Sequence, residues 1–237
     1  MPPSFFLKET TVLLLAVLAI PTPAIAQDGS HHLRPHAAAQ VQLAQTDLPQ
    51  GEAVLQLYGG PRTRTPLVQW YLEELDVPYE YVSLDLQAEE HRQPDYLAIN
   101  PIGKVPVIVD GDFNLWESGA ILLYLADKHG AMPAALEDRA LINQWVIFAN
   151  ATLGRELFRE EQRPQELSRL LTPINDVLSQ QPFMLGSELT AADVAVGSYL
   201  YYATFLTSLD LADYPAIASY LDRLAERPAF INTIGQR

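Results

Sequence analysis

The sequence predicts an α/β domain followed by an all-helical domain. Between residues 53 and 130 the order strand, helix, strand, helix, strand, strand, helix can be followed in the pattern of apolar residues. Through 136–237 apolar residues instead recur at helical spacing. The chain has 237 residues, 49% of them hydrophobic, so it can bury a sizeable core.

The first domain opens with a strand at residues 54–58, which Gly59-Gly60-Pro61 ends. A helix follows, with Pro66 at its first position, where a missing N–H costs nothing. Residues 79–86 alternate as a strand does, and 87–99 have weak helical character. A helix that joins two strands predicts that those strands are parallel.

A hairpin and one further helix complete the domain. Residues 107–109 and 113–116 are strand-prone runs joined by Asp110-Gly111, a strong hairpin signal. Glu117-Ser118 then opens a segment with helical periodicity that we expect to end at Gly130. Together these elements predict the thioredoxin-like arrangement.

The start of that last helix has the features of a ligand site. The N–H groups in the first turn of a helix have no partner within the helix, and they can hold a carboxylate. Just before the hairpin, Val105-Pro106 interrupts the strand, because proline supplies no N–H and sometimes takes a cis bond. An unpaired backbone edge beside such a helix start predicts a site for a peptide-like ligand.

The helical half contains five predicted segments. Thr190 to Asp193 begins one of them as a variant of the capping box, which we assign to structure rather than chemistry. The predicted segments are 136–160, 164–180, 190–207, 214–226 and a short one after Pro228.

Composition excludes several functions. The net charge of −14 argues against a nucleic-acid partner or an anionic membrane surface, since both need Lys and Arg. The chain contains no cysteine, so it can form neither a disulfide nor a thiolate metal site, and it has no catalytic thiol. A mixed disulfide with the protein is excluded for the same reason. We expect no metal.

The N-terminus resembles an export signal. Residues 1–26 combine Lys8, a short apolar run and Ala24-Ile25-Ala26, which predicts a signal peptide and a periplasmic or otherwise exported protein. The alternative is an over-extended start site and a cytoplasmic protein. Residues 27–52 predict a linker, and the three histidines within it are a chance cluster or a metal trap. We expect no membrane insertion once the leader is removed.

Several motifs, in order and at consistent spacing, resemble the soluble glutathione S-transferase family, closest to its bacterial chi-like and theta-like classes. The resemblance covers residues 54–237 and implies a glutathione-binding domain at 53–130, a helical domain at 136–237, and a homodimer. The motifs are Leu-Tyr-Gly-Gly at 57–60, Leu-Glu-Glu-Leu-Asp-Val-Pro-Tyr at 72–79, Asn-Pro-Ile-Gly-Lys-Val-Pro at 100–106, Glu-Ser-Gly-Ala-Ile at 117–121, Leu-Thr-Ala-Ala-Asp-Val-Ala-Val at 189–196 and Tyr-Leu-Asp-Arg-Leu-Ala-Glu-Arg-Pro-Ala-Phe at 220–230.

The resemblance implies where glutathione binds. The backbone of Val105, exposed by a cis Pro106, would pair with the cysteinyl amide. Glu117 and Ser118 would hold the γ-glutamyl end. The helix start and the Ser118 hydroxyl suit the carboxylate, and the acid of Glu117 suits the ammonium group. The alternative for this pair is a plain helix start.

Two basic side chains would hold the other end of glutathione, according to the same resemblance. Lys104 would face the glycyl carboxylate; a lysine solvated at the end of a strand is the alternative. His91 lies fourteen residues before Val105, the separation of a theta-class histidine that meets the same carboxylate. An exposed helix histidine is the alternative.

The group that activates the glutathione thiol is left open. Alignment on Tyr58 puts Thr63 where relatives carry Ser or Cys, and a threonine hydroxyl would donate a hydrogen bond to the thiolate. Lowering a thiol pKa from about 8.5 to about 6.5 needs roughly 2.7 kcal/mol. One charge-assisted hydrogen bond contributes about 1.5–3 kcal/mol. The guanidinium of Arg64 or Arg62 could supply the remaining stabilisation of the thiolate. Tyr58 is a third candidate, and a solvated loop without a catalytic role is the alternative.

The implied activity is conjugation of the glutathione thiolate to hydrophobic electrophiles, the detoxification reaction of the family, with peroxide reduction by glutathione as a variant. A different hypothesis is a non-catalytic glutathione-binding or protein-interaction module on the same fold. Four aromatic residues of the helical half are candidates for the electrophile site or for the core. These are Trp145, Phe148, Tyr201 and Phe205.

Overall fold

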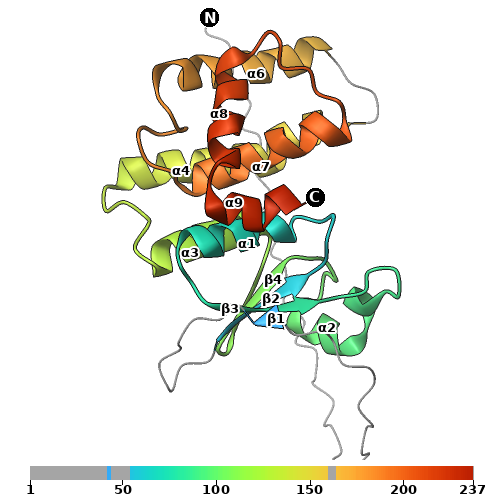
Figure 1. Ribbon diagram of the computed structural model, residues 1–237. Coiled ribbons are helices and arrows are strands. Elements are labelled where there is room, and N and C mark those ends of the chain that lie inside the picture. The colour runs from blue at the N-terminus through green and yellow to red at the C-terminus, as the bar shows by residue number, and fades with distance from the viewer. Residues whose placement is uncertain (1–41, 44–53, 160–163, 237) are drawn as a thin grey trace, which may run out of the picture. The chain divides into compact units, whose positions relative to one another are not determined.

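The computed structural model describes residues 42–43, 54–159 and 164–236 (Figure 1). From residue 54 onward the order of elements is the predicted one: an α/β domain with the thioredoxin-like arrangement, then a helical domain. The predicted signal peptide, its three downstream histidines and most of the predicted linker lie outside the described residues.

The sheet has five strands in the order β1-β3-β2-β4-β5. Strands β2 and β3 are parallel, as a helix crossover between them predicts, and the other neighbouring pairs are antiparallel. Strand β1 lies inside the predicted linker, so that segment contributes an edge strand that its composition did not indicate. The bounds are β1 Gln42–Leu43, β2 Leu55–Gly59, β3 Tyr79–Ser83, β4 Val107–Asp110 and β5 Phe113–Trp116.

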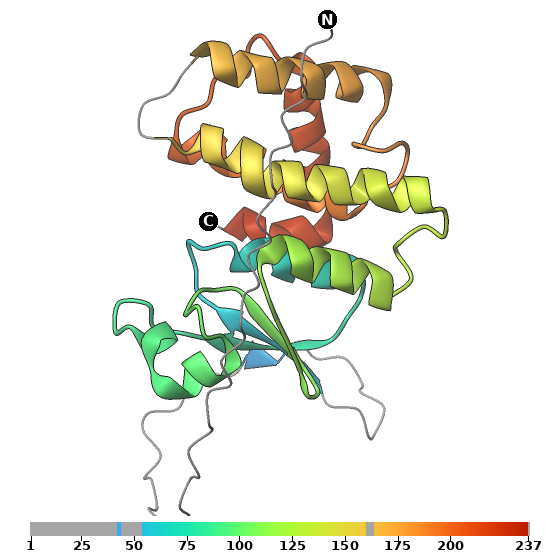
Figure 2. The ribbon, with the colours of Figure 1, turned by 180° about the vertical axis from the view of Figure 1, so that it is seen from behind.

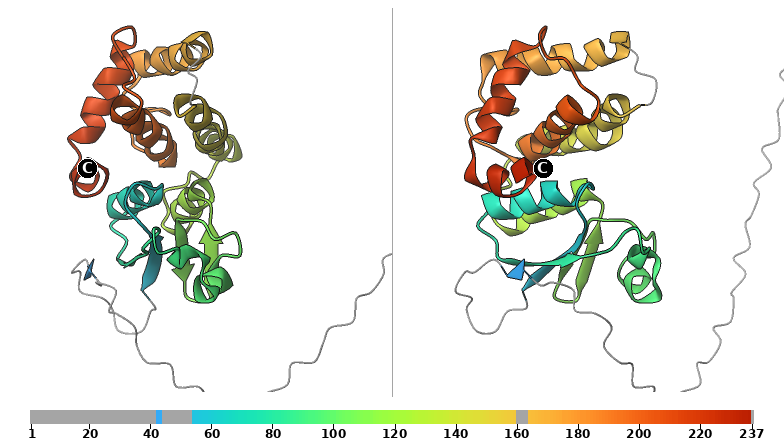
Figure 3. Two further views of the ribbon diagram at one scale, coloured as in Figure 1. Left: turned by 90° about the vertical axis from the view of Figure 1, so that its right-hand side faces the viewer. Right: turned by 45° about the vertical axis from the view of Figure 1, so that its right-hand side comes forward.

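Two helices pack on one face of the sheet, α1 (Thr65–Glu74) and α3 (Ser118–Lys128). The short helices η1 (Glu90–Arg92) and α2 (Pro94–Ile99) lie below the sheet in Figure 1, away from α1 and α3. The face that α1 turns to the core is fully buried, as its apolar spacing predicts. Figure 3 shows the same layers from the side.

Close approach of backbone and side chain fixes the entry into α1. A Cβ added to Gly59 would lie 2.0 Å from the Thr65 Oγ1, so only glycine fits at the end of β2. Pro66 occupies the first turn, where its missing N–H is tolerated. The loop between β2 and α1, which carries three predicted site residues, is therefore tightly constrained at both ends.

The helical domain matches the predicted segments closely. The first predicted segment is one continuous run in Figure 2, but its centre, η2, is a π-helix rather than an α-helix. The elements are α4 Leu136–Phe148, η2 Ala149–Leu153, α5 Gly154–Leu157, α6 Pro164–Gln180, α7 Ala191–Leu206, α8 Pro215–Ala225, α9 Pro228–Asn232 and η3 Ile234–Gln236.

Helix α7 is the centre of this domain, since twelve of its sixteen residues are buried. Its start is the predicted capping box: the Thr190 side chain accepts from the helix backbone, and Asp193 bonds back to the Thr190 N–H at 2.9 Å. Asp193 also accepts from the backbone N–H of Met184 at 2.7 Å. The assignment of this motif to structure is confirmed.

The two domains are joined by a bidentate ion pair. Arg227, directly before α9, donates to both carboxylate oxygens of Glu74 at the end of α1, at 2.7 and 2.6 Å. The indole of Trp70 donates to the same carboxylate at 2.7 Å. A planar guanidinium matches a carboxylate in this geometry, so the contact fixes orientation as well as distance.

The predicted cis peptide bond between Val105 and Pro106 is present. Among the described residues, no helix is long and apolar enough to cross a membrane.

Candidate functional site

The loop between β2 and α1 is organised by Thr63. Its hydroxyl donates to the Gly60 carbonyl at 2.7 Å and accepts from the Thr65 N–H at 3.0 Å. The buried Thr65 hydroxyl lies 2.8 Å from the same oxygen. A threonine has a single O–H donor, so a hydrogen bond from Thr63 to a thiolate would compete with the bond to Gly60.

The loop before β4 is held through one carbonyl group. The Lys104 carbonyl accepts from the Tyr96 hydroxyl at 2.5 Å and from the buried Asn100 amide at 2.8 Å. Gly103 adopts φ of 63°, and an added Cβ would lie 3.0 Å from the His91 carbonyl. Only glycine suits that position. The backbone at Val105 is thus fixed before any ligand binds.

The start of α3 carries backbone strain. Glu117, the residue before the helix, has φ of 71°, which is uncommon for any residue but glycine. Such strain concentrates at functional sites, where surrounding structure must hold it. Ser118 follows with only 1% of its surface exposed. Its hydroxyl donates to Asn150 Oδ1 at 3.0 Å.

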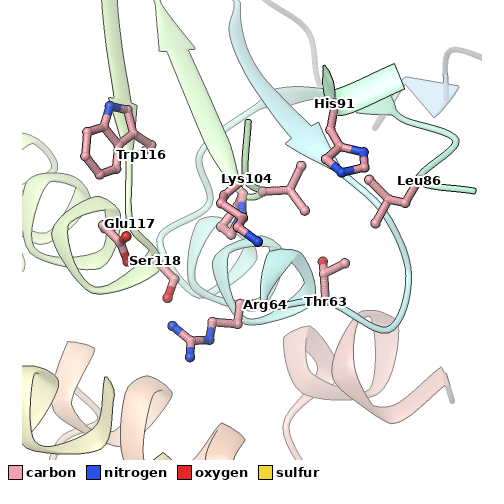
Figure 4. A pocket seen from close by; sticks show the side chains of 10 residues that line it. Thr63, Arg64, Leu86, His91, Lys104, Trp116, Glu117 and Ser118 are labelled. Atoms are coloured by element: carbon pink, nitrogen blue, oxygen red, sulfur yellow. The ribbon is translucent and has the colours of Figure 1, made fainter. Parts of the chain in front are cut away.

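These three segments surround one cavity of about 520 Å³ (Figure 4). Eight of the nine predicted site residues line it, and Arg62 does not. Leu86 and Trp116 complete the lining. The full set is Thr63, Arg64, Leu86, His91, Lys104, Val105, Pro106, Trp116, Glu117 and Ser118.

The charges in this cavity suit a ligand with two acidic ends. Figure 4 shows Arg64 extending toward the start of α3, with Lys104 between it and His91. No carboxylate of the described part of the chain forms an ion pair with Arg64 or Lys104. The buried Nδ1 of His91 has no hydrogen-bond partner there. In a chain of net charge −14, such cations favour an anionic ligand.

Arg62 lines a second cavity, of about 660 Å³, to which Thr63 and Arg64 also contribute. Of the four aromatic candidates from the sequence, Phe205 lines this cavity and the other three do not. The lining is Pro61, Arg62, Thr63, Arg64, Phe158, Tyr199, Tyr202, Phe205, Leu206 and Gln236.

Sequence reasoning missed the polar residues behind the site. Tyr199 on α7 donates to the same Asn150 oxygen that Ser118 uses, at 3.0 Å. Burial raises the pKa of the Tyr199 hydroxyl, which keeps it a donor. The Arg64 guanidinium lies 5.5 Å from the centre of its ring, a cation–π contact. No local pattern distinguishes Asn150 from other polar helix residues.

The sequence only weakly indicates that Trp116 and Leu86 line the cavity. Trp116 directly precedes the predicted ligand-binding pair at 117–118, although it was assigned only to a strand.

Among the described residues there is no group of three or more His, Asp or Glu that could hold a metal ion.

A thioredoxin-like domain with a ligand cavity at the start of its last helix, followed by a helical domain, defines a class of glutathione-binding proteins. Residues 53–127 match the family model "Glutathione S-transferase, N-terminal domain", and residues 158–223 match "Glutathione S-transferase, C-terminal domain". The chain belongs to the glutathione S-transferase family.

Relatives agree with this assignment. The glutathione S-transferase-like protein tpcF of Aspergillus fumigatus is 31% identical, over 73% of this chain and 91% of that protein. The disulfide-bond oxidoreductase YfcG of Escherichia coli is 30% identical, over 74% of this chain and 92% of that protein. A solved glutathione transferase of Burkholderia graminis, with two glutathione molecules bound per subunit, superposes with a TM-score of 0.70 at 28% identity, covering 77% and 88%.

The absence of cysteine excludes one kind of thiol chemistry for this chain. A mixed disulfide with this chain remains excluded, because the chain has no sulfur nucleophile. Exchange between two thiol-bearing ligands needs no protein sulfur.

Proposed function

We propose that this protein is a glutathione transferase that adds the glutathione thiolate to hydrophobic electrophiles. The observation that carries the proposal is the cavity in which Arg64, Lys104 and the start of α3 converge around the backbone of Val105. Glutathione has two carboxylates, one ammonium group and one thiol. Each of these groups finds a complementary partner among the residues that line the cavity.

The γ-glutamyl end lies at the start of α3 in this proposal. The N–H groups of the first turn there receive the carboxylate, and Glu117 receives the ammonium group. The Ser118 hydroxyl already donates to Asn150, so the backbone N–H of Ser118, rather than its hydroxyl, is the donor to the carboxylate. The glycyl carboxylate lies at the opposite end, beside Lys104 and His91.

Arg64 is the main group that stabilises the thiolate in this proposal. The Thr63 hydroxyl, first in the order predicted from sequence, donates to Gly60 and must turn away from it to reach a sulfur. Arg64 lines both cavities, has several N–H donors, and carries a charge that favours the ionised thiol. Thr63 then fixes the loop and contributes a second donor when it turns.

In the reaction, the thiol proton passes to solvent and the thiolate forms a carbon–sulfur bond with the electrophile. With a chloronitrobenzene, chloride departs with the bonding electron pair; with an isothiocyanate, the thiolate adds to the central carbon and the nitrogen takes up a proton. The protein supplies position, because both cavities meet at Thr63 and Arg64, and electrostatic stabilisation of the sulfur. Peroxide reduction would use the same thiolate.

Disulfide reduction is a second candidate function, and a specific observation favours it. A relative 30% identical is named a disulfide-bond oxidoreductase, and a solved neighbour binds two glutathione molecules per subunit. Two glutathione molecules would reduce one substrate disulfide: the substrate becomes two thiols, and the two glutathione thiols become the disulfide of oxidised glutathione. The third candidate is a glutathione-binding module without turnover.

Assays on the full chain separate the three candidates. Conjugation of a chloronitrobenzene or an isothiocyanate with glutathione supports the transferase. Turnover of a small disulfide without conjugation supports the oxidoreductase. Retention on immobilised glutathione with neither activity supports the module, and absence of retention and of both activities contradicts all three.

We propose a homodimer as the assembly. Support comes from exposed apolar side chains on β5 and α4, because contact between apolar surface and water is unfavourable and a partner subunit would cover them. They are Phe113, Trp116, Leu136, Leu141 and Ile147. Sedimentation at twice the monomer mass supports the proposal, and a monomer at micromolar concentration contradicts it.

Export is proposed from residues 1–26 alone. N-terminal sequencing of the natural protein tests it: a chain that begins at Gln27 supports removal of a leader. A chain that begins at Met1 contradicts it.

A further inference from the structure

The second cavity combines aromatic walls with a purely cationic charge. Among the described residues that line it, two arginines are the only charged ones and none is a carboxylate. Four rings form its walls: Phe158, Tyr199, Tyr202 and Phe205. Phe158 and Phe205 are 38% and 46% exposed, so the ring faces are accessible to a ligand.

The two arginines of this cavity differ. Arg64 also lines the glutathione cavity and stacks on Tyr199, and it already has a role in the reaction proposed above. Of these two cavities Arg62 lines the second alone; it is exposed and makes no hydrogen bond or ion pair in the described part of the chain. The chain carries 29 acidic residues against 15 basic ones. An arginine without a carboxylate here favours an anionic ligand.

The backbone directs Arg62 to this position. Its φ of 60° lies in the left-handed region, which is uncommon for a residue other than glycine. The hydrogen bond from Thr63 to the Gly60 carbonyl closes the turn on which Arg62 sits. Arg62 therefore lines the second cavity, whereas Thr63 and Arg64, which follow it, line both cavities. Strain of this kind concentrates at ligand sites.

We propose that the second cavity selects flat aromatic electrophiles that bear an acid group, and that Arg62 is the residue that pairs with the acid. The rings stack on the electrophile, and the guanidinium of Arg62 takes the carboxylate in a bidentate pair. The conjugation step rests on the proposed transferase function, but the binding preference does not. Thr63 and Arg64, shared by both cavities, bring the reacting carbon of the electrophile beside the sulfur.

For an aryl chloride the step balances without a further reactant. The glutathione thiolate attacks the ring carbon, a carbon–sulfur bond forms, and the carbon–chlorine bond breaks. Chloride leaves with the bonding pair, and the proton of the thiol goes to solvent.

A calorimetric titration of the full chain with two unreactive ligands tests the preference. These are 3,5-dinitrobenzoate and 1,3-dinitrobenzene, which share the dinitrophenyl ring and differ in the carboxylate. We expect the acid to bind about tenfold more tightly, the size of one charge-assisted pair. In Arg62→Gln the ratio falls to about threefold or less, and Arg62→Lys retains part of it. The control Arg169→Gln removes the same charge from α6 and keeps the wild-type ratio.

A rate comparison then tests the reaction separately. The full chain is given glutathione with 4-chloro-3,5-dinitrobenzoate or 2-chloro-1,3-dinitrobenzene, and each rate is divided by its uncatalysed rate. We expect a higher kcat/KM for the acid, and a preference that depends on Arg62.

Equal binding of acid and neutral ligand, or a preference that survives Arg62→Gln, overturns the proposal. So does a second glutathione that occupies this cavity and excludes the acid, with a stoichiometry of two in wild type and one in Arg62→Gln. If the acid binds preferentially but neither chloride is conjugated, the proposed transferase function fails and the binding preference stands.

Discussion

The Ser118 hydroxyl donates a hydrogen bond to Oδ1 of Asn150 at 3.0 Å, which ties the first residue of α3 to the π-helix η2. Tyr199 donates to the same oxygen, and the Asn150 amide nitrogen donates to the Val146 carbonyl at 2.9 Å. The amide is therefore oriented by three bonds. The start of α3 is held in place by the helical domain as well as by the sheet.

Asn150→Ala is expected to weaken glutathione binding about tenfold. The change leaves the hydroxyls of Ser118 and Tyr199 without their acceptor, at a cost of about 1–3 kcal/mol for a buried polar group. The start of α3 then loses its position. Titration calorimetry measures the affinity.

Gln144→Ala is the matched control, since it also removes a side-chain amide but from an exposed position on α4. It should leave the affinity for glutathione unchanged. If Asn150→Ala lowers the melting temperature while the affinity for glutathione holds, Asn150 is structural only.

Arg64→Gln is expected to raise the pKa of the bound glutathione thiol by about one unit, because the thiolate loses a cation that stabilises it. Turnover requires the thiolate, so activity rises with pH through that pKa. The pH–rate profile of the variant should therefore move to higher pH. Thiolate absorbance across a pH series measures the shift directly.

Thr63→Ala provides the comparison, because its hydroxyl donates to Gly60 in the free protein. We expect lower stability and a smaller shift of the thiol pKa than in Arg64→Gln. A larger shift in Thr63→Ala would reverse the two roles.

Glu74→Ala is expected to destabilise the protein by about 2 kcal/mol. It leaves Arg227 without its carboxylate and the Trp70 indole without an acceptor. This loss is smaller than the roughly 3–5 kcal/mol of a fully buried pair because the Arg227 side chain is 35% exposed. Urea unfolding monitored by circular dichroism gives the free energy of unfolding.

The double variant with Arg227→Ala should lose less than the sum of the two single losses, because either change already breaks the pair. Strict additivity would show that the two side chains contribute independently.

Asp110→Asn tests a contact between β4 and α3. Partial burial opposes ionisation of Asp110, but hydrogen bonds from Lys128 and Tyr124 outweigh it and hold the pKa of Asp110 below its ordinary value. A lowered pKa in the folded state adds stability above the unfolded pKa, about 3.9, and that stability is lost as pH falls through the folded value.

Asp110→Asn should therefore be about 1 kcal/mol less stable at neutral pH, a small value because Lys128 is exposed to solvent. The two stability curves should converge as the pH falls. Curves that stay parallel down to acid pH would contradict the assignment.

Elements with a clear periodicity of apolar residues, or with a strong turn or capping motif at their boundary, were predictable from sequence. The hairpin around Asp110-Gly111 and the capping box at Thr190 have local causes, so their positions in the structure match closely. Strand β1 and the π-helix η2 depend on tertiary contacts, and no local pattern indicates them.

The candidate site likewise has a part that local sequence features indicate and a part that they do not. The residues predicted beside a proline, a glycine turn or a helix start line the first cavity, and those features mark backbone available to a ligand. Asn150 and Tyr199 were missed because they reach the site from a different domain, far along the chain. The two hydroxyls predicted as ligand donors, on Thr63 and Ser118, bond to internal acceptors that only the folded structure reveals.

A crystal structure of the full chain grown with saturating glutathione tests the central claim most directly. The account predicts the tripeptide along the backbone of Val105, with its γ-glutamyl carboxylate at the N–H of Ser118 and its sulfur within hydrogen-bonding reach of Arg64. An empty first cavity, or glutathione bound in the second cavity alone, would contradict it.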